Sequence, residues 1–134
     1  MDYKIESFEK FNDKRGQLVV FLRNRNLDKK FKKFGQIYFV TFEKKGVIRG
    51  NHYHKTFREW FGVISGKVQV ALIDVKTGKK KEMILDGDSE KYVRLEIGPN
   101  VAHGFKSLTK YVSLVNYTDK EWNEKDVIHV EAIK

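Results

Sequence analysis

The sequence lacks cysteine, long apolar runs and a recognisable leader. Without cysteine among its 134 residues, it has neither a disulfide framework nor a thiolate metal site. No window approaches the apolar length that a membrane-spanning segment needs. Residues 1–10 alternate charged and apolar side chains, whereas a signal peptide has an unbroken apolar stretch. We therefore expect a cytoplasmic protein with no membrane partner.

The length and composition favour one domain with one core, covering residues 1–134. Hydrophobic residues make up 40% of the chain and aromatic residues 13%, which is enough to fill a barrel or sandwich. No internal repeat, low-complexity linker or domain boundary divides it.

The formal net charge of +9 raises the question of a nucleic-acid partner. Basic residues concentrate at 29–33 and at 76–81, where the second segment is predicted to be a hairpin tip. Neither segment has the pattern of a recognition helix or of a paired aromatic RNA-binding motif. We therefore expect no nucleic-acid partner, and a small phosphate-bearing ligand suits the same positive field.

Most apolar runs are short and alternate with polar residues, which is the period of half-buried strands. Strands are predicted at 17–22, 37–43, 47–54, 59–64, 67–75, 80–85, 92–97 and 111–117. Glycine, aspartate and asparagine mark the turns between them. Only 27–34 and 118–126 are candidate helices, and both are brief. The pattern predicts an all-β barrel or sandwich.

Histidines gather at two places in the chain. His52 and His54 project from the same face of a strand, because side chains alternate with period two. Glu59 opens the following strand, so one barrel holding both strands would add a carboxylate to the two imidazoles. A turn at residues 98–100 delivers His103 to a further strand. His129 lies outside both places and is predicted to be a structural or surface residue.

The predicted set of His52, His54, Glu59 and His103 suits two kinds of chemistry. Three imidazoles and a carboxylate can bind zinc, iron, manganese or nickel, with positions open for water or substrate. A histidine pair without metal can instead act as base and acid near neutral pH. His52 cannot easily serve as metal ligand and base at once, so the two interpretations compete.

These spacings resemble the first signature of the cupin superfamily. Its marker residues stand in register as Gly46, His52, His54, Glu59 and Gly66. The second signature is matched by Pro99 and His103, while Gly98 and Asn100 depart from it in ways compatible with a turn. The resemblance implies a single-domain cupin, a double-stranded β-helix or jelly-roll barrel.

Within the cupins, the chain resembles WxcM-like and related enzymes that act on nucleotide-linked 4-keto-6-deoxysugars. Residues 101–105 and 13–16 resemble segments of dTDP-4-dehydrorhamnose 3,5-epimerases, as does Tyr117 closing a late strand. The His-Tyr-His-Lys run at 52–55 is nearer to the dTDP-4-keto-6-deoxyglucose 3,4-ketoisomerases. The likeness runs from about Phe11 to Trp122.

Two departures bear on the reaction. The 3,5-epimerases place a tyrosine acid where this chain has Glu121, Trp122 and Asn123, so that proton donor is missing. The 3,4-ketoisomerases usually have glutamine in place of Glu59 and work without a metal, whereas glutamate is typical of metal-binding cupins. The resemblance implies an isomerase or epimerase that needs no cofactor; the alternatives are a metal-dependent cupin, such as a dioxygenase, and a non-catalytic sugar-binding cupin.

Roles follow for individual residues under the sugar-nucleotide hypothesis. His52 is the expected base and His54 returns the proton. Arg49 is expected to bind the diphosphate, although its odd offset from His52 requires a rim position, a bulge or a dimer interface.

Further substrate-binding roles follow from the resemblance. If no metal is bound, Glu59 and His103 bind or orient the substrate, and Tyr117 is expected to contact it. The family likeness also implies a homodimer in which Arg15 contributes to the neighbouring nucleotide site.

Overall fold

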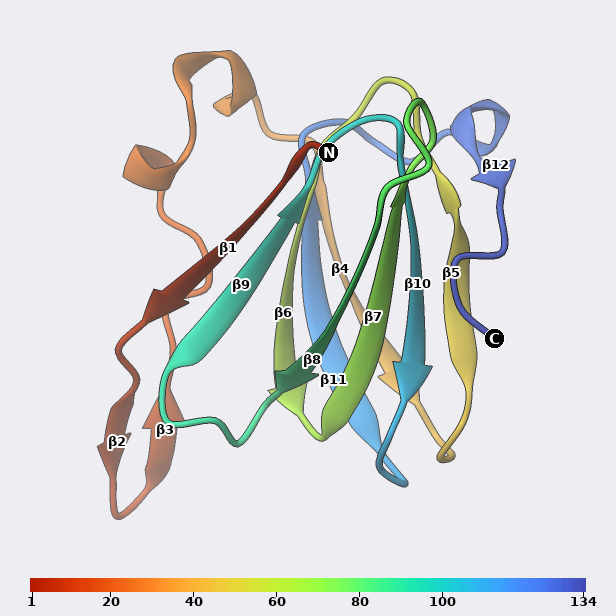
Figure 1. Cartoon of the computed structure of the whole chain (residues 1–134). Coiled ribbons are helices and arrows are strands. Elements are labelled where there is room, and N and C mark those ends of the chain that lie inside the picture. Colours follow the sequence, from red (N-terminus) through yellow and green to blue (C-terminus); the bar gives the residue numbers. More distant parts are fainter.

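The computed structural model describes residues 1–134, and strands are its only long elements of secondary structure (Figure 1). The strands are β1 (Tyr3–Phe8), β2 (Phe11–Asp13), β3 (Gly16–Leu18), β4 (Gln36–Phe42), β5 (Ile48–Tyr53), β6 (Glu59–Ser65), β7 (Lys67–Asp74), β8 (Lys80–Asp86), β9 (Tyr92–Ile97), β10 (Val101–Ser107), β11 (Val112–Thr118) and β12 (Ile128–His129). Three short 3₁₀ turns are η1 (Asn24–Asn26), η2 (Lys29–Phe31) and η3 (Glu124–Asp126). No helix is both long and apolar enough to cross a membrane.

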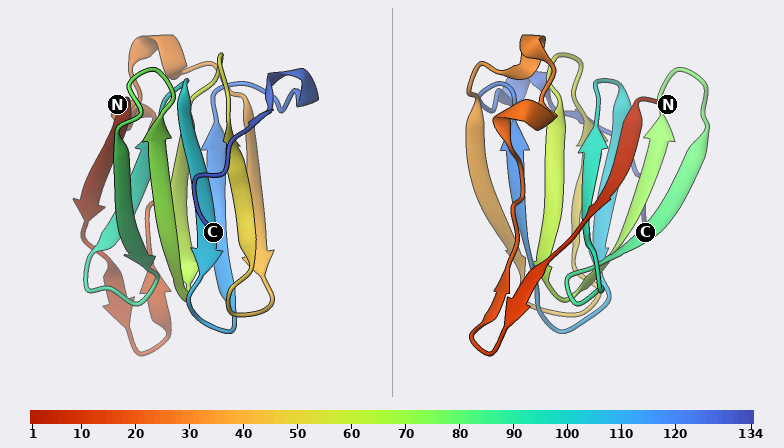
Figure 2. Two further views of the ribbon diagram at one scale, coloured as in Figure 1. Left: turned by 45° about the vertical axis from the view of Figure 1, so that its right-hand side comes forward. Right: turned by 90° about the vertical axis from the view of Figure 1, so that its left-hand side faces the viewer.

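Two five-stranded antiparallel sheets form the barrel (Figure 2). The first sheet has the order β1-β9-β6-β11-β4, and the second has the order β12-β5-β10-β7-β8. The β2–β3 hairpin pairs only with itself and extends away from both sheets. This arrangement confirms the all-β jelly-roll prediction.

The core lies between the two sheets because alternate side chains of each strand point inward. In β7, Val68, Val70 and Leu72 are fully buried. Leu95 of β9 and Leu114 of β11 join the same apolar cluster from the other sheet. Burial of this cluster stabilises the fold by about 25 cal/mol per Å² of apolar surface removed from water.

The N-terminal third differs most from the sequence prediction. The strand expected at 17–22 is wrong beyond Leu18, because residues 19–22 pair with no strand and instead cross the outer face of the first sheet. There, Val19 and Phe21 line an apolar hollow with Val115. The candidate helices at 27–34 and 118–126 are also wrong, since each contains only a single 3₁₀ turn.

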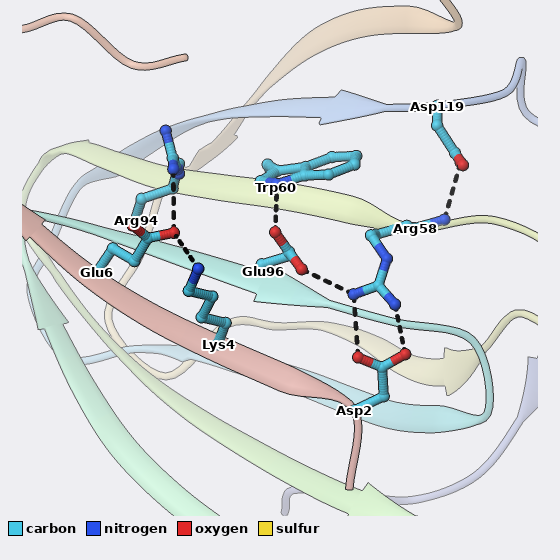
Figure 3. A network of polar contacts seen from close by, with 8 residues as sticks. All are labelled: Asp2, Lys4, Glu6, Arg58, Trp60, Arg94, Glu96 and Asp119. Atoms are coloured by element: carbon cyan, nitrogen blue, oxygen red, sulfur yellow. Dashed lines mark hydrogen bonds and ion pairs between the residues drawn. The ribbon is translucent and has the colours of Figure 1, made fainter. Parts of the chain in front are cut away.

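Strand β1, which the sequence interpretation missed, is tied to the barrel by the ion pairs in Figure 3. The Arg58 guanidinium contacts the Asp2 carboxylate and also donates to Glu96 Oε2 at 2.8 Å. The indole of Trp60 donates to the other Glu96 oxygen at 2.7 Å. These contacts hold the start of β6, and therefore Glu59, against β9.

Candidate active site

Pairing of β5 with β10 brings together the two histidine-bearing segments. His52 lies directly opposite His103 in the antiparallel register. On the other side of β5, the short strand β12 pairs His129 with His52. The imidazoles that are 51 positions apart in the chain thus become neighbours.

A bulge in β5 decides where Arg49 lies. Gly50 and Asn51 have φ angles of +86° and +55°, and the register with β10 shifts between His103 and Gly104. A Cβ atom at Gly50 would lie 2.8 Å from the His103 carbonyl oxygen, so the close approach requires glycine. The bulge places Arg49 on the same cavity as His52 despite their odd offset.

The three imidazoles converge as predicted. The His52 ring centroid is 4.9 Å from the centroids of both His54 and His103, and the other two lie 5.9 Å apart. One ring nitrogen from each lies within 4.8 Å of the others. Glu59 joins them, with Oε2 3.6 Å from His54 Nε2 and 3.2 Å from His103 Nε2. No donor reaches Glu59 Oε2 with hydrogen-bond geometry.

Backbone carbonyls determine the tautomers of two of these rings. His54 Nδ1 lies 2.6 Å from the carbonyl oxygen of Asp126, and His103 Nδ1 lies 3.1 Å from that of Val101. A carbonyl only accepts, so both Nδ1 atoms carry hydrogen. In the neutral rings, both Nε2 atoms therefore present lone pairs towards Glu59. This convergence of acceptors favours a proton or a metal cation among them.

Burial governs the charges in this cluster. It lowers the pKa of His52 to about 4, helped by repulsion from His103 and His54. Burial likewise lowers the pKa of His54, against the opposing effect of Glu59. For Glu59, burial acts to raise the pKa, but the surrounding imidazoles, His103 foremost, outweigh it and lower it. His52 is accordingly a neutral imidazole at pH 7.

A cavity of about 160 Å³ opens beside the cluster. It is lined by Tyr38, Val40, Phe42, Arg49, Gly50, His52, Phe61, His103, Phe105 and Leu114. Arg49 Nε donates to the Thr41 carbonyl at 3.2 Å, and its guanidinium lies over Phe42. His52 and His103 therefore face the cavity, while His54 and Glu59, which do not line it, lie behind them.

Comparison with known proteins finds relatives over nearly the whole chain. Residues 1–132 match the family model described as FdtA, WxcM-like, C-terminal. The chain belongs to this family. The WxcM-like assignment confirms the resemblance seen in the sequence motifs.

Relatives of the WxcM-like chain include isomerases, and its structural neighbours include epimerases. TDP-4-oxo-6-deoxy-alpha-D-glucose-3,4-oxoisomerase of Aneurinibacillus thermoaerophilus is 27% identical over 128 residues, covering 96% of this chain and 86% of the relative. A solved 3,4-ketoisomerase from Helicobacter canadensis is 26% identical, with a TM-score of 0.79, and covers 96% of this chain and 90% of that one. The 3,5-epimerase RmlC of Legionella pneumophila Philadelphia 1 shares the fold, with a TM-score of 0.80 at 22% identity, covering 95% of this chain and 71% of that one.

Two residues predicted from the resemblance lie away from the imidazoles of the WxcM-like chain. Arg15 sits at the exposed tip of the β2–β3 hairpin, where it pairs with Asp13. Tyr117 points outward from β11 and packs between Trp60 and Phe34, because Leu114 and its alternate neighbours occupy the inner face. Within one chain, neither residue joins the cavity.

Three residues that sequence reasoning missed support the site. Tyr38 lines the cavity, and the alternation of residues 38, 40 and 42 along the predicted strand was the available signal. Phe57 stacks on His54 with ring centroids 3.8 Å apart. Asp126 comes from a segment that has no motif. Burial acts to raise the pKa of its carboxyl, but the hydrogen bonds from Thr56 and Lys55 outweigh this and lower it.

Proposed function

We propose that this WxcM-like protein isomerises a nucleotide-diphosphate-linked 4-keto-6-deoxysugar, moving the carbonyl between C4 and C3. The observation that carries the proposal is the shared cavity: the neutral imidazole of His52 and the guanidinium of Arg49 line one hollow. The names of the relatives that are 27% and 26% identical support the ketoisomerase over the epimerase. A guanidinium suits the diphosphate, and an imidazole suits the acidic C–H beside the ketone.

The reaction requires four proton transfers, two at carbon and two at oxygen. His52 takes the proton from C3, and the resulting enolate oxygen at C4 gains a proton. The C3 hydroxyl then loses its proton as the new carbonyl forms, while C4 receives one. His54 lies behind His52, with the two ring centroids 4.9 Å apart, so it returns the proton to the sugar by way of the His52 ring. Net composition is unchanged, so the residues of this chain suffice without an oxidant or reductant.

The test follows a TDP-linked 4-keto-6-deoxyglucose by NMR in heavy water. We expect the carbonyl to migrate to C3, with deuterium incorporated at C4. Replacement of a general base costs roughly 10²- to 10⁴-fold in rate, so His52→Asn should lose that much. His129→Asn, which changes an exposed imidazole outside the cavity, is the matched control. Folded wild-type protein that neither binds TDP nor exchanges the sugar hydrogen would refute the proposal.

A homodimer is proposed as the working form. The outer face of the first sheet exposes Ile37, Phe39 and Ile64, with exposed fractions of 62%, 77% and 50%. Apolar side chains gathered on one face favour a protein partner. In such a dimer, the exposed Arg15 of the β2–β3 hairpin is available to a neighbouring nucleotide site. The expected location remains the cytoplasm.

A metal-dependent reaction is the second candidate, favoured by the tautomers of His54 and His103. Their Nε2 atoms and the unbonded Glu59 Oε2 form an acceptor-only cluster that fits a divalent cation. His52, His54, His103 and Glu59 would hold zinc, iron, manganese or nickel, which would polarise a substrate carbonyl. Elemental analysis of the purified protein tests this candidate: about one metal per chain supports it, and none after saturation with each metal refutes it.

A further inference from the structure

We propose that Asp126 is a positioning residue for the proton transfer, holding the His54 ring so that its Nε2 faces the cluster. The inference rests on the proposed function for its kinetic consequence, but its structural part stands on geometry alone. Asp126 lies 72 residues after His54 and outside every motif in the sequence. It belongs to the C-terminal strap, which we define as residues 123–133, running along β5 (Figure 1).

The backbone of Asp126 provides the first restraint. Its carbonyl oxygen lies 2.6 Å from His54 Nδ1, and the His54 side chain is only 3% exposed. Because the carbonyl accepts a hydrogen, this contact selects the tautomer with hydrogen on Nδ1. The lone pair of the neutral ring is then on Nε2, the atom 3.6 Å from Glu59.

The carboxylate of Asp126 provides the second restraint. It accepts from the backbone N–H of Lys55 at 2.8 Å and from that of Thr56 at 3.1 Å. The Thr56 hydroxyl adds a third hydrogen bond of 2.6 Å. One aspartate thus binds the residues that directly follow His54, while its own carbonyl binds the ring. The carbonyl cannot move relative to His54 unless this carboxylate clamp opens.

The far end of the strap is anchored on the residue before His52. The Asn51 side chain accepts from the backbone N–H groups of Ala132 and Ile133 and donates to the Ile133 carbonyl. The backbone N–H of Val130 also donates to the Asn51 carbonyl at 2.9 Å. The strap is therefore fixed on both sides of the His52–His54 pair, and this makes the Asp126 contact a defined restraint.

Phe57 restrains one motion of the His54 ring and leaves the other to Asp126. It stacks on His54 with an interplanar angle of 27°, which holds the plane of the imidazole. A ring held only by its plane can still turn over by about 180°, because the terminal torsion of histidine is broad and roughly two-fold. The hydrogen bond to Asp126 prevents this rotation. It keeps Nδ1 as the donor to the carbonyl and Nε2 as the atom that faces Glu59.

The test compares Asp126→Ala with Asp119→Ala. Asp119 is a matched control because its carboxylate accepts the Arg58 backbone N–H at 2.9 Å in the same loop but contacts no imidazole. In chelator-treated wild type, ¹⁵N NMR should show His54 with hydrogen on Nδ1. Asp126→Ala should convert this to a mixture of tautomers, whereas Asp119→Ala should retain it.

Kinetics provide the second readout. Loss of a group that orients a functional imidazole typically costs about 10- to 100-fold, so kcat of Asp126→Ala should fall by that factor. KM should stay within about threefold, because Arg49 and the cavity lining are untouched. Asp119→Ala should lower the melting temperature while keeping kcat near the wild-type value. If Asp126→Ala does not fold, Asp126→Asn and Thr56→Val weaken the same clamp less severely.

Two results would overturn the inference. One is wild-type His54 with its hydrogen on Nε2. The other is a folded clamp variant that keeps both the single Nδ1–H tautomer and the wild-type kcat. The NMR measurement needs no substrate, so a protein that shows the tautomer change but never turns over the keto-sugar retains the positioning role and refutes only the proposed reaction.

Discussion

Replacement of Glu59 by glutamine separates the two candidate chemistries. The side chain is 3% exposed and faces two imidazole nitrogens at 3.2 Å and 3.6 Å. Glutamine keeps its size and supplies a neutral amide that can donate to one of the Nε2 lone pairs. The ketoisomerases that the chain resembles usually carry glutamine there. A metal-free isomerase should therefore tolerate the change.

The magnitude follows from the two distances. At an effective dielectric constant of about 20, a unit positive charge on either ring nitrogen attracts the carboxylate by about 5 kcal/mol. Desolvation of the buried carboxylate offsets much of that attraction. A net loss of about 2 kcal/mol corresponds to roughly 30-fold weaker cation binding.

The assay measures turnover and thermal unfolding of Glu59→Gln, each with chelator and with added zinc. We expect isomerisation within about tenfold of wild type, because a positioned general base is retained. Any zinc-dependent rise in melting temperature should shrink, as expected for weaker binding to the folded state. A folded variant with a more than about hundredfold loss of turnover would refute this reasoning, since it would show that the carboxylate itself takes part in the reaction.

Three further predictions concern the ligand, the interface and the core. Arg49→Gln should weaken TDP binding, measured by calorimetry, at least about tenfold, because a charge-assisted contact is lost. The control Lys79→Gln removes the same charge at the β7–β8 turn and should leave the affinity unchanged. Equal affinities of the two variants for TDP would exclude Arg49 as a diphosphate ligand. Phe39→Glu should convert the proposed dimer to a monomer in light scattering, and an unchanged mass would place the interface elsewhere. Leu72→Ala should lower the free energy of unfolding in urea by about 2–4 kcal/mol through loss of buried surface and a residual cavity; a loss below about 1 kcal/mol would contradict the packing described.

Much of the site was predictable because it depends on local periodicity. His52 and His54 share a face in any regular strand, and Glu59 begins the next one. Their meeting with His103 required a long-range pairing, which the turn at residues 98–100 suggested but did not specify. The family resemblance implied one barrel that holds both segments, and the β5–β10 register shows how they meet.

Where the sequence predictions failed or missed a residue, the cause is physical and local sequence patterns do not encode it. Alternation at 17–22 reflects packing on the outside of a sheet, which produces the same apolar period as a hydrogen-bonded ladder. The side of β11 on which Tyr117 lies depends on register, and a shift of one residue reverses it. Asp126 contacts His54 through its backbone carbonyl, which leaves no trace in residue type, and its carboxylate binds Lys55 and Thr56, which are remote in the sequence.

The bulge at Gly50 and Asn51 also couples the position of Arg49 to that of His103, because both residues adjoin it and both line the cavity. The backbone kink that turns Arg49 inward presses against the strand carrying His103, with space there for hydrogen alone. Gly50→Ala would therefore have two effects at a distance from each other, rotating the cation away from the entrance and pushing one imidazole out of the triad. Binding of the ligand and transfer of the proton therefore both depend on the absence of a side chain at Gly50.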